Sequence, residues 1–179
     1  MIAQTITRFL LCHLAALWLL TGLQAADRYA LIIGNAAYEG AMALDNPVND
    51  AEAMRDALQK LGFKVTMLTD ADLPMMERGV YEFTEQLKPH SLALFFFAGH
   101  GIEASGENYL IPVQSQISEE YSLKRRSYSA TDIMEELSHS PAKIKVMVLD
   151  CCRNNPLERS WVRSGSRSVR TGSLAAMEQ

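Results

Sequence analysis

A histidine and two adjacent cysteines carry the chemistry that this sequence offers. Cys151 and Cys152 come shortly after an apolar run that ends at Leu149, and His100 lies between two glycines after a second apolar run. A thiol becomes a strong nucleophile when a histidine within hydrogen-bonding distance takes its proton. The two groups need only be neighbours in space. The sequence therefore predicts a pairing between His100 and one of the two cysteines.

A structural role is the alternative for each of these residues. An average cysteine is a buried apolar residue, and a single histidine is commonly a structural one. A disulfide between neighbouring cysteines closes a strained ring, which excludes a disulfide framework. Position favours chemistry, because both motifs follow buried strands, and open α/β sheets bind their ligands at the carboxyl ends of strands.

Parallel strands must bring the two motifs together. Four apolar or alternating segments predict the main strands: 28–34, 63–68, 92–97 and 143–149. Helical spacing predicts helices between them, capped by Asn49 or Asp50, by Asp72 and by Thr131. Residues 107–112 predict a short strand or hairpin arm. This order predicts an α/β fold with a mostly parallel sheet and helices on both faces.

Composition limits the class of function. The chain has 179 residues, which favours one domain, and a formal charge of −4, which disfavours nucleic acid as a partner. No His/Cys cluster suggests zinc, no Gly-x-Gly-x-x-Gly fingerprint suggests a nucleotide, and no loop has the spacing of calcium ligands. We therefore expect no cofactor, with calcium activation as an alternative that no motif supports.

The two ends of the chain differ from the segment between them. Residues 1–25 contain Arg8, an apolar run over 9–20 and a small residue at Ala25, a pattern typical of a secretory signal peptide. We expect an exported protein, periplasmic or secreted, with an uncleaved membrane anchor as the alternative. Residues 157–179 are rich in Arg, Ser and Gly, which predicts a loop.

Four motifs, in order along the chain, resemble those of the bacterial caspase-like proteins (orthocaspases, the metacaspase-type members of the caspase-fold cysteine peptidases). They are Tyr-Ala-Leu-Ile-Ile-Gly-Asn at 29–35, Pro-Val-Asn-Asp-Ala at 47–51, Phe-Phe-Ala-Gly-His-Gly at 96–101 and Leu-Asp-Cys-Cys-Arg-Asn-Asn-Pro at 149–156. In caspases the histidine lies about 50 residues before the cysteine, and Cys152 follows His100 by 52. The resemblance implies a catalytic domain over residues 28–156.

The resemblance also implies a role for each site residue. Cys152 would be the nucleophile, with Cys151 in the place of a small residue, and His100 the general base. The N–H groups of Gly101 and Cys152 would form the oxyanion hole. Metacaspase-type enzymes cleave proteins or peptides after Arg or Lys, and Asp50 and Asp150 match the positions that bind this side chain. The alternatives are a helix cap for Asp50 and bonds to backbone amides for Asp150.

The end of the chain departs from the family pattern. The family continues into further strands, so we expect residues 157–179 to begin a truncated C-terminal part and the sheet to have an open edge, which a partner chain would complete. The arginines of this segment are a target for self-cleavage or a solvated basic tail. Two rival functions follow: a caspase-fold interaction module without catalysis, and an exported α/β binding or thiol-redox protein.

Overall fold

The first predicted strand lies inside the parallel part of the sheet. The computed structural model describes residues 26–117 and 120–152. β1 (Arg28–Gly34) is buried after its first residue, as expected of a strand covered on both faces. It pairs in parallel with β2 (Lys64–Thr69) and with β3 (Leu92–Ala104), and β6 (Ile144–Cys152) pairs in parallel with β3. The predicted parallel sheet is therefore present.

β3 changes its partner along its length. Its pairing with β1 ends at Ala98, and residues 101–104 pair antiparallel with β4 (Glu107–Leu110). The two-residue strand β5 (Tyr128–Ser129) then pairs antiparallel with β4. The predicted hairpin arm is confirmed, and it lies between two strands. β3 is thus the strand shared by the parallel and antiparallel parts of the sheet.

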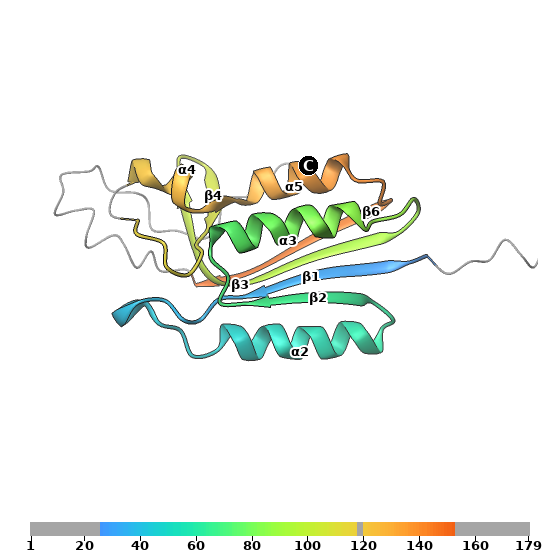
Figure 1. Ribbon diagram of the computed structural model, residues 1–179, viewed down its shortest axis with the longest axis horizontal. Helices are drawn as coiled ribbons and strands as arrows, with labels where there is room; N and C mark the ends of the chain where they lie inside the picture. The colour runs from blue at the N-terminus through green and yellow to red at the C-terminus, as the bar shows by residue number, and fades with distance from the viewer. Residues whose placement is uncertain (1–25, 118–119, 153–179) are drawn as a thin grey trace, which may run out of the picture.

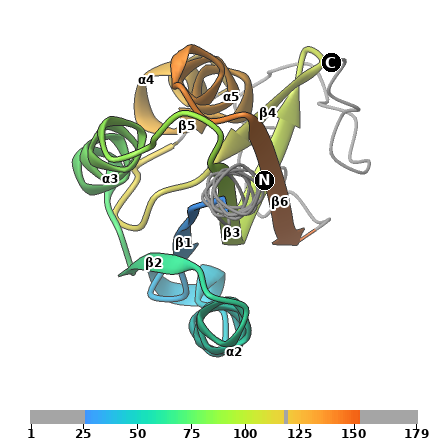
Figure 2. The ribbon, with the colours of Figure 1, turned by 90° about the vertical axis from the view of Figure 1, so that its right-hand side faces the viewer.

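Helices cover both faces of the sheet (Figures 1 and 2). α2 (Pro47–Lys60) lies on one face, and α3 (Leu73–Glu85) and α5 (Ala130–His139) lie on the other. The larger apolar core packs α3 and α5 against the sheet, and a smaller one packs α2 against it. The described part of the chain also forms three short helices: η1 (Gly40–Met42), η2 (Glu120–Ser122) and α4 (Leu123–Arg126).

The helix caps only partly follow the prediction. Asp72 caps α3 as expected, and its side chain accepts a hydrogen bond of 2.9 Å from Met75 N. α2 begins earlier than predicted, with Asn46 at the N-cap, so Asn49 and Asp50 lie in its first turn. The reason is Pro47, whose fixed φ suits the first position of a helix. α5 begins one residue before Thr131, and its cap is Ser129.

The two motif strands are longer than predicted. β3 continues through His100 to Ala104, and β6 continues through Cys152, whereas the prediction ended these strands at residues 97 and 149. The two strands pair with each other over 98–100 and 150–152, and residues 101–104 of β3 pair with β4, so both motifs stay extended. The segment predicted as a polar loop over 115–128 contains η2, α4 and the first residue of β5.

The outer side of β6 is open among the described residues. β6 pairs with β3 alone there, and Ile144 and Val148 are 51% and 37% exposed. None of the helices within 26–117 and 120–152 has the length and apolar character of a membrane span. The predicted leader, and the tail with its arginines, lie outside the described residues.

Candidate active site

The pairing of β3 with β6 brings the histidine and cysteine motifs together. Their parallel register runs from Leu92 opposite Ile144 to His100 opposite Cys152. Neighbouring strands lie about 4.8 Å apart, so the backbones of His100 and Cys152 are adjacent at the carboxyl ends of their strands. The predicted juxtaposition of these two motifs is therefore present in the fold, although 52 residues separate them in the sequence.

The imidazole of His100 is held by a backbone carbonyl group. His100 is 5% exposed, and its Nε2 lies 2.7 Å from the carbonyl oxygen of Met42 at the end of η1. A carbonyl oxygen only accepts hydrogen bonds, so Nε2 carries the hydrogen and donates it. Nδ1 of the neutral ring is then the acceptor. It is buried and has no hydrogen-bond partner among the described residues.

The environment of His100 favours its neutral form. Burial lowers the pKa of His100 below its ordinary value of 6.5, and the hydrogen bond to Met42 offsets part of this effect. At neutral pH the ring is therefore unprotonated at Nδ1 and able to take a proton. This state is the one that a general base needs.

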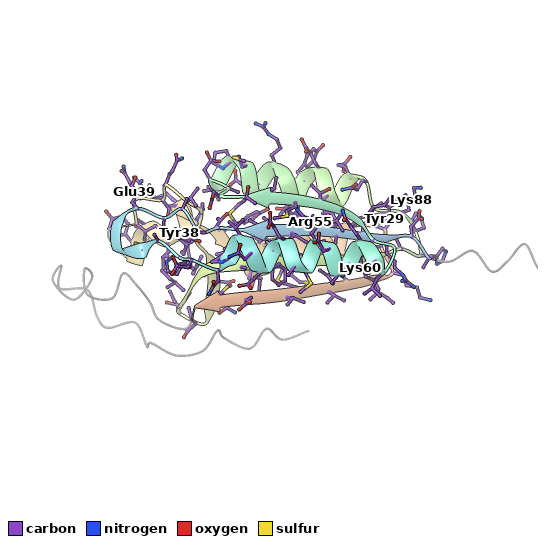
Figure 3. All side chains as sticks on the ribbon, turned by 90° about the horizontal axis from the view of Figure 1, so that it is seen from below. Tyr29, Tyr38, Glu39, Arg55, Lys60 and Lys88 are labelled. Atoms are coloured by element: carbon purple, nitrogen blue, oxygen red, sulfur yellow. The ribbon has the colours of Figure 1, made fainter. Side chains whose placement is uncertain are left out.

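Tyr38 contacts both the backbone and the ring of His100. Its hydroxyl accepts a hydrogen bond of 3.0 Å from His100 N and donates one of 2.9 Å to Ile111 O. The rings of Tyr38 and His100 are tilted by 54°, with centroids 4.4 Å apart. Figure 3 labels Tyr38 at the end of the sheet opposite Tyr29 and Lys88. Tyr38 thus joins the loop after β1 to the histidine.

Two polar side chains fix the loop that carries Tyr38 and Met42. Asn35 is fully buried and bonds both backbone groups of Ala71, with Oδ1 accepting from Ala71 N at 2.8 Å and Nδ2 donating to Ala71 O at 3.1 Å. The carboxylate of Asp70 accepts hydrogen bonds from the amides of Ala36 and Ala37, both at 2.8 Å. The loop is therefore anchored to the end of β2.

The N–H group of Gly101 faces the β6 side of β3. Ile111 N donates to His100 O at 3.0 Å, so the backbone groups of His100 face the β4 side. Adjacent positions of an antiparallel ladder alternate between hydrogen-bonded and non-hydrogen-bonded pairs. His100 and Ile111 are a bonded pair, so the next pair, Gly101 opposite Leu110, is a non-bonded one. Its N–H therefore turns away from β4, toward the strand that carries Cys152.

An acidic pocket opens beside the two motifs. The pocket measures about 390 Å³. Its lining includes Asp50 of α2, Asp45 of the loop before α2 and Asp150 of β6, together with Gly99 and Cys151. All three aspartates are exposed, and none forms an ion pair with another described residue. Asp50 and Asp150, predicted from widely separated motifs, thus share one pocket.

Cys151 lies between the larger core and the acidic pocket. Its side chain is partly buried, packs against the larger core and lines the acidic pocket. This packing agrees with the structural role that the motif favours for it. Within 26–117 and 120–152, no group of His, Cys, Asp and Glu side chains has the arrangement of a metal site.

Three residues near the site were not predicted from the sequence. Met42 contributes a backbone carbonyl, for which no residue type gives a signal. Tyr38 lies four residues after the first strand, a position that spacing alone does not distinguish. Asp45 could have been predicted as a pocket residue, because it is a carboxylate five residues before Asp50 and just before the helix start.

Comparison with known proteins identifies the family of this chain. The caspase-domain model of peptidase family C14 matches residues 27–175. The chain is 30% identical over 129 residues to the human mucosa-associated lymphoid tissue lymphoma translocation protein 1, and equally to its mouse homologue. These matches cover 72% of this chain but only 15% of the length of each relative.

Two solved structures share the fold. The Drosophila initiator caspase Dronc aligns over 72% of this chain and 50% of its own, with a TM-score of 0.53 and 12% identity. Protein GSU0716 of Geobacter sulfurreducens aligns over 69% and 48%, with a TM-score of 0.51 and 16% identity. The predicted fold class is thus confirmed. The family match spans most of the sequence, and the chain belongs to the caspase-domain family of cysteine peptidases.

Proposed function

We propose that this protein is a cysteine-type endopeptidase that cleaves after Arg or Lys, with Cys152 as nucleophile and His100 as general base. The observation that carries the proposal is the register of β3 and β6, which pairs the positions of His100 and Cys152. The family supports a hydrolase acting on protein substrates. The dyad and the preference for basic residues are the parts proposed here.

The tautomer of His100 assigns the proton transfers. The Met42 carbonyl keeps the hydrogen on Nε2, so Nδ1 takes the proton of the Cys152 thiol as sulfur attacks the scissile carbonyl. The imidazolium then gives this proton to the leaving amine as the C–N bond breaks. Water attacks the resulting thioester with His100 again as base, which releases the carboxyl product and restores the thiol.

The oxyanion would be bound by backbone N–H groups. The N–H of Gly101 faces the side of β3 on which Cys152 lies, as its place in the ladder indicates. We propose that Gly101 N and Cys152 N donate to the negative oxygen of the tetrahedral intermediate. One such donor commonly contributes about 10²- to 10³-fold to kcat.

The acidic pocket supports the preference for basic residues. Asp50 and Asp150 lie on the same pocket, and a guanidinium paired with a carboxylate makes charge-assisted hydrogen bonds of defined direction. No described cation neutralises these carboxylates. A substrate ending in Asp would instead meet like charge at the cleavage position.

Two further expectations complete the proposal. Export rests on the leader pattern of residues 1–25. A partner chain completing the sheet rests on the outer edge of β6, with which no described strand other than β3 pairs. The substitution Val148→Lys should weaken such an association, and sedimentation velocity measures it; an unchanged oligomeric state in this variant would argue against pairing there.

The experiment is a comparison of fluorogenic peptides ending in Arg, Lys or Asp before the reporter. Purified protein should hydrolyse the Arg and Lys peptides and leave the Asp peptide intact, with and without calcium. Cys152→Ala should abolish hydrolysis, and Cys151→Ala, the matched control, should retain it. Folded protein without hydrolysis of any peptide would favour the non-catalytic interaction module.

A further inference from the structure

The hydroxyl of Tyr38 occupies a position where a regular sheet has a direct hydrogen bond. His100 and Ile111 face each other at the end of the β3–β4 ladder, and Ile111 N donates to His100 O at 3.0 Å. In a regular antiparallel pair, His100 N would donate to Ile111 O in return. Here the Tyr38 hydroxyl stands between these two atoms, 3.0 Å from the first and 2.9 Å from the second.

The surrounding chain makes room for this hydroxyl. A Cβ atom at Gly99 would lie 2.7 Å from Tyr38 Oη and 2.9 Å from the ring of Phe97, closer than real Cβ contacts. A side chain at position 99 is therefore incompatible with the present place of the tyrosine. Tyr38 itself is 6% exposed and packs in an apolar cluster with Ile102 and Ile111.

The ring of Tyr38 also contacts the imidazole. The centroids lie 4.4 Å apart, so the tyrosine restrains His100 through the ring as well as through the backbone. Met42 O restrains the same imidazole at Nε2 from four residues farther along the loop. These contacts leave Nδ1 as the ring atom without a partner among the described residues.

We infer that Tyr38 is a positioning residue for His100, holding its backbone through the inserted hydroxyl and its imidazole through the packed ring. The inference rests on the proposed function for its effect on catalysis. Tyr38 does not reach the acidic pocket, whose lining residues do not include it. Its loss should therefore lower kcat and leave KM for an Arg peptide unchanged.

Two substitutions separate the hydroxyl from the ring. Tyr38→Phe removes both hydroxyl bonds and keeps the ring, and we expect kcat to fall about 10- to 100-fold, as small misplacements of a catalytic group do. Tyr38→Leu removes the ring and exposes the imidazole, so the pKa of His100 should rise toward its ordinary value. The pKa of His100 is measured by NMR of the histidine ring signals as a function of pH. The signal that is missing in His100→Asn is the one of His100.

A matched control addresses general destabilisation. Tyr128 is also buried, and its hydroxyl donates to Glu136 in the antiparallel part of the fold. Tyr128→Phe loses a buried hydroxyl bond outside the site and should keep the wild-type kcat. Thermal melting of each variant confirms that it is folded at the assay temperature.

The outcomes decide the inference and the proposed function separately. Wild-type kcat in folded Tyr38→Phe, or an unchanged pKa of His100 in folded Tyr38→Leu, overturns the positioning role. A kcat loss shared equally by Tyr128→Phe also overturns it. If the wild-type protein hydrolyses no peptide, the proposed function fails, and the His100 titration in Tyr38→Leu still decides whether the tyrosine controls the histidine.

Discussion

Gly99 offers a quantitative test of how tightly the site is packed. The substitution Gly99→Ala would place a Cβ atom 2.7 Å from Tyr38 Oη, 2.9 Å from Phe97 Cζ and 3.2 Å from Asn35 O. Real Cβ contacts are longer than the shortest of these distances, so a neighbouring atom must shift. We expect the tyrosine hydroxyl, at the end of its side chain, to move away from His100 N and Ile111 O, which it now joins.

The expected loss follows from the two bonds and the packing. A net hydrogen bond contributes about 1 kcal/mol, and an unsatisfied buried group costs about 1–3 kcal/mol. Overpacking against Phe97 costs about 1–3 kcal/mol more. Together these terms give about 3–7 kcal/mol, and we expect Gly99→Ala to lower the free energy of unfolding by that amount, a large part of the stability of an ordinary domain.

Urea unfolding measures this loss, and Gly106→Ala is the matched control. Gly106 has φ of +82°, and no atom lies within 4 Å of the Cβ that alanine would add. Its substitution should cost about 1 kcal/mol of backbone strain alone. The kcat of Gly99→Ala should also fall, since the restraint on His100 is lost. Equal stability losses in the two variants would refute the reasoning.

The remaining predictions concern pH, the pocket and the loop. Because burial lowers the pKa of His100, the acid-side midpoint of kcat/KM for an Arg peptide should lie below 6.5, the ordinary pKa of histidine, as a pH profile measures. The folded state binds this proton less readily than the unfolded one, so the free energy of unfolding also falls as pH drops below 6.5. Asp50→Asn should lower kcat/KM for the Arg peptide about tenfold, while Asp56→Asn on the same helix should not, and equal effects would count against the pocket. Asn35→Ala leaves both backbone groups of Ala71 without their partner and should cost about 3 kcal/mol in urea unfolding; a loss below about 1 kcal/mol would contradict the anchoring role.

The sequence predicted the fold correctly where a local pattern has one common structural meaning, such as an apolar run or a helix cap. The bounds of β1 agree with the apolar run at 28–34, and Asp72 caps α3 because its carboxylate reaches Met75 N. The meeting of the two motifs was predicted from the rule that the carboxyl ends of parallel strands lie at the same edge of a sheet, and the pairing of β3 with β6 brings it about. Asp50 and Asp150 were predicted from the family resemblance, and the fold places both on one pocket.

The rest depended on contacts that have no pattern in the sequence. Glycines flanking His100 suggested a strand end, yet pairing with Cys152 and with β4 keeps this segment in the sheet. Met42 acts through its backbone, so any residue type is compatible with that role. Tyr38 reaches His100 across 62 residues of sequence, and only the fold reveals this contact.

The most direct test of the central claim is covalent labelling of the nucleophile. A peptide ending in arginine, with a thiol-alkylating group in place of the scissile bond, is added to the protein, and the modified residue is located by mass mapping. We predict labelling of Cys152 that is strongly slowed in His100→Ala and absent with the matching Asp-ending reagent. Labelling of Cys151 instead, or equal labelling by the two reagents, would contradict the proposed dyad and its acidic pocket.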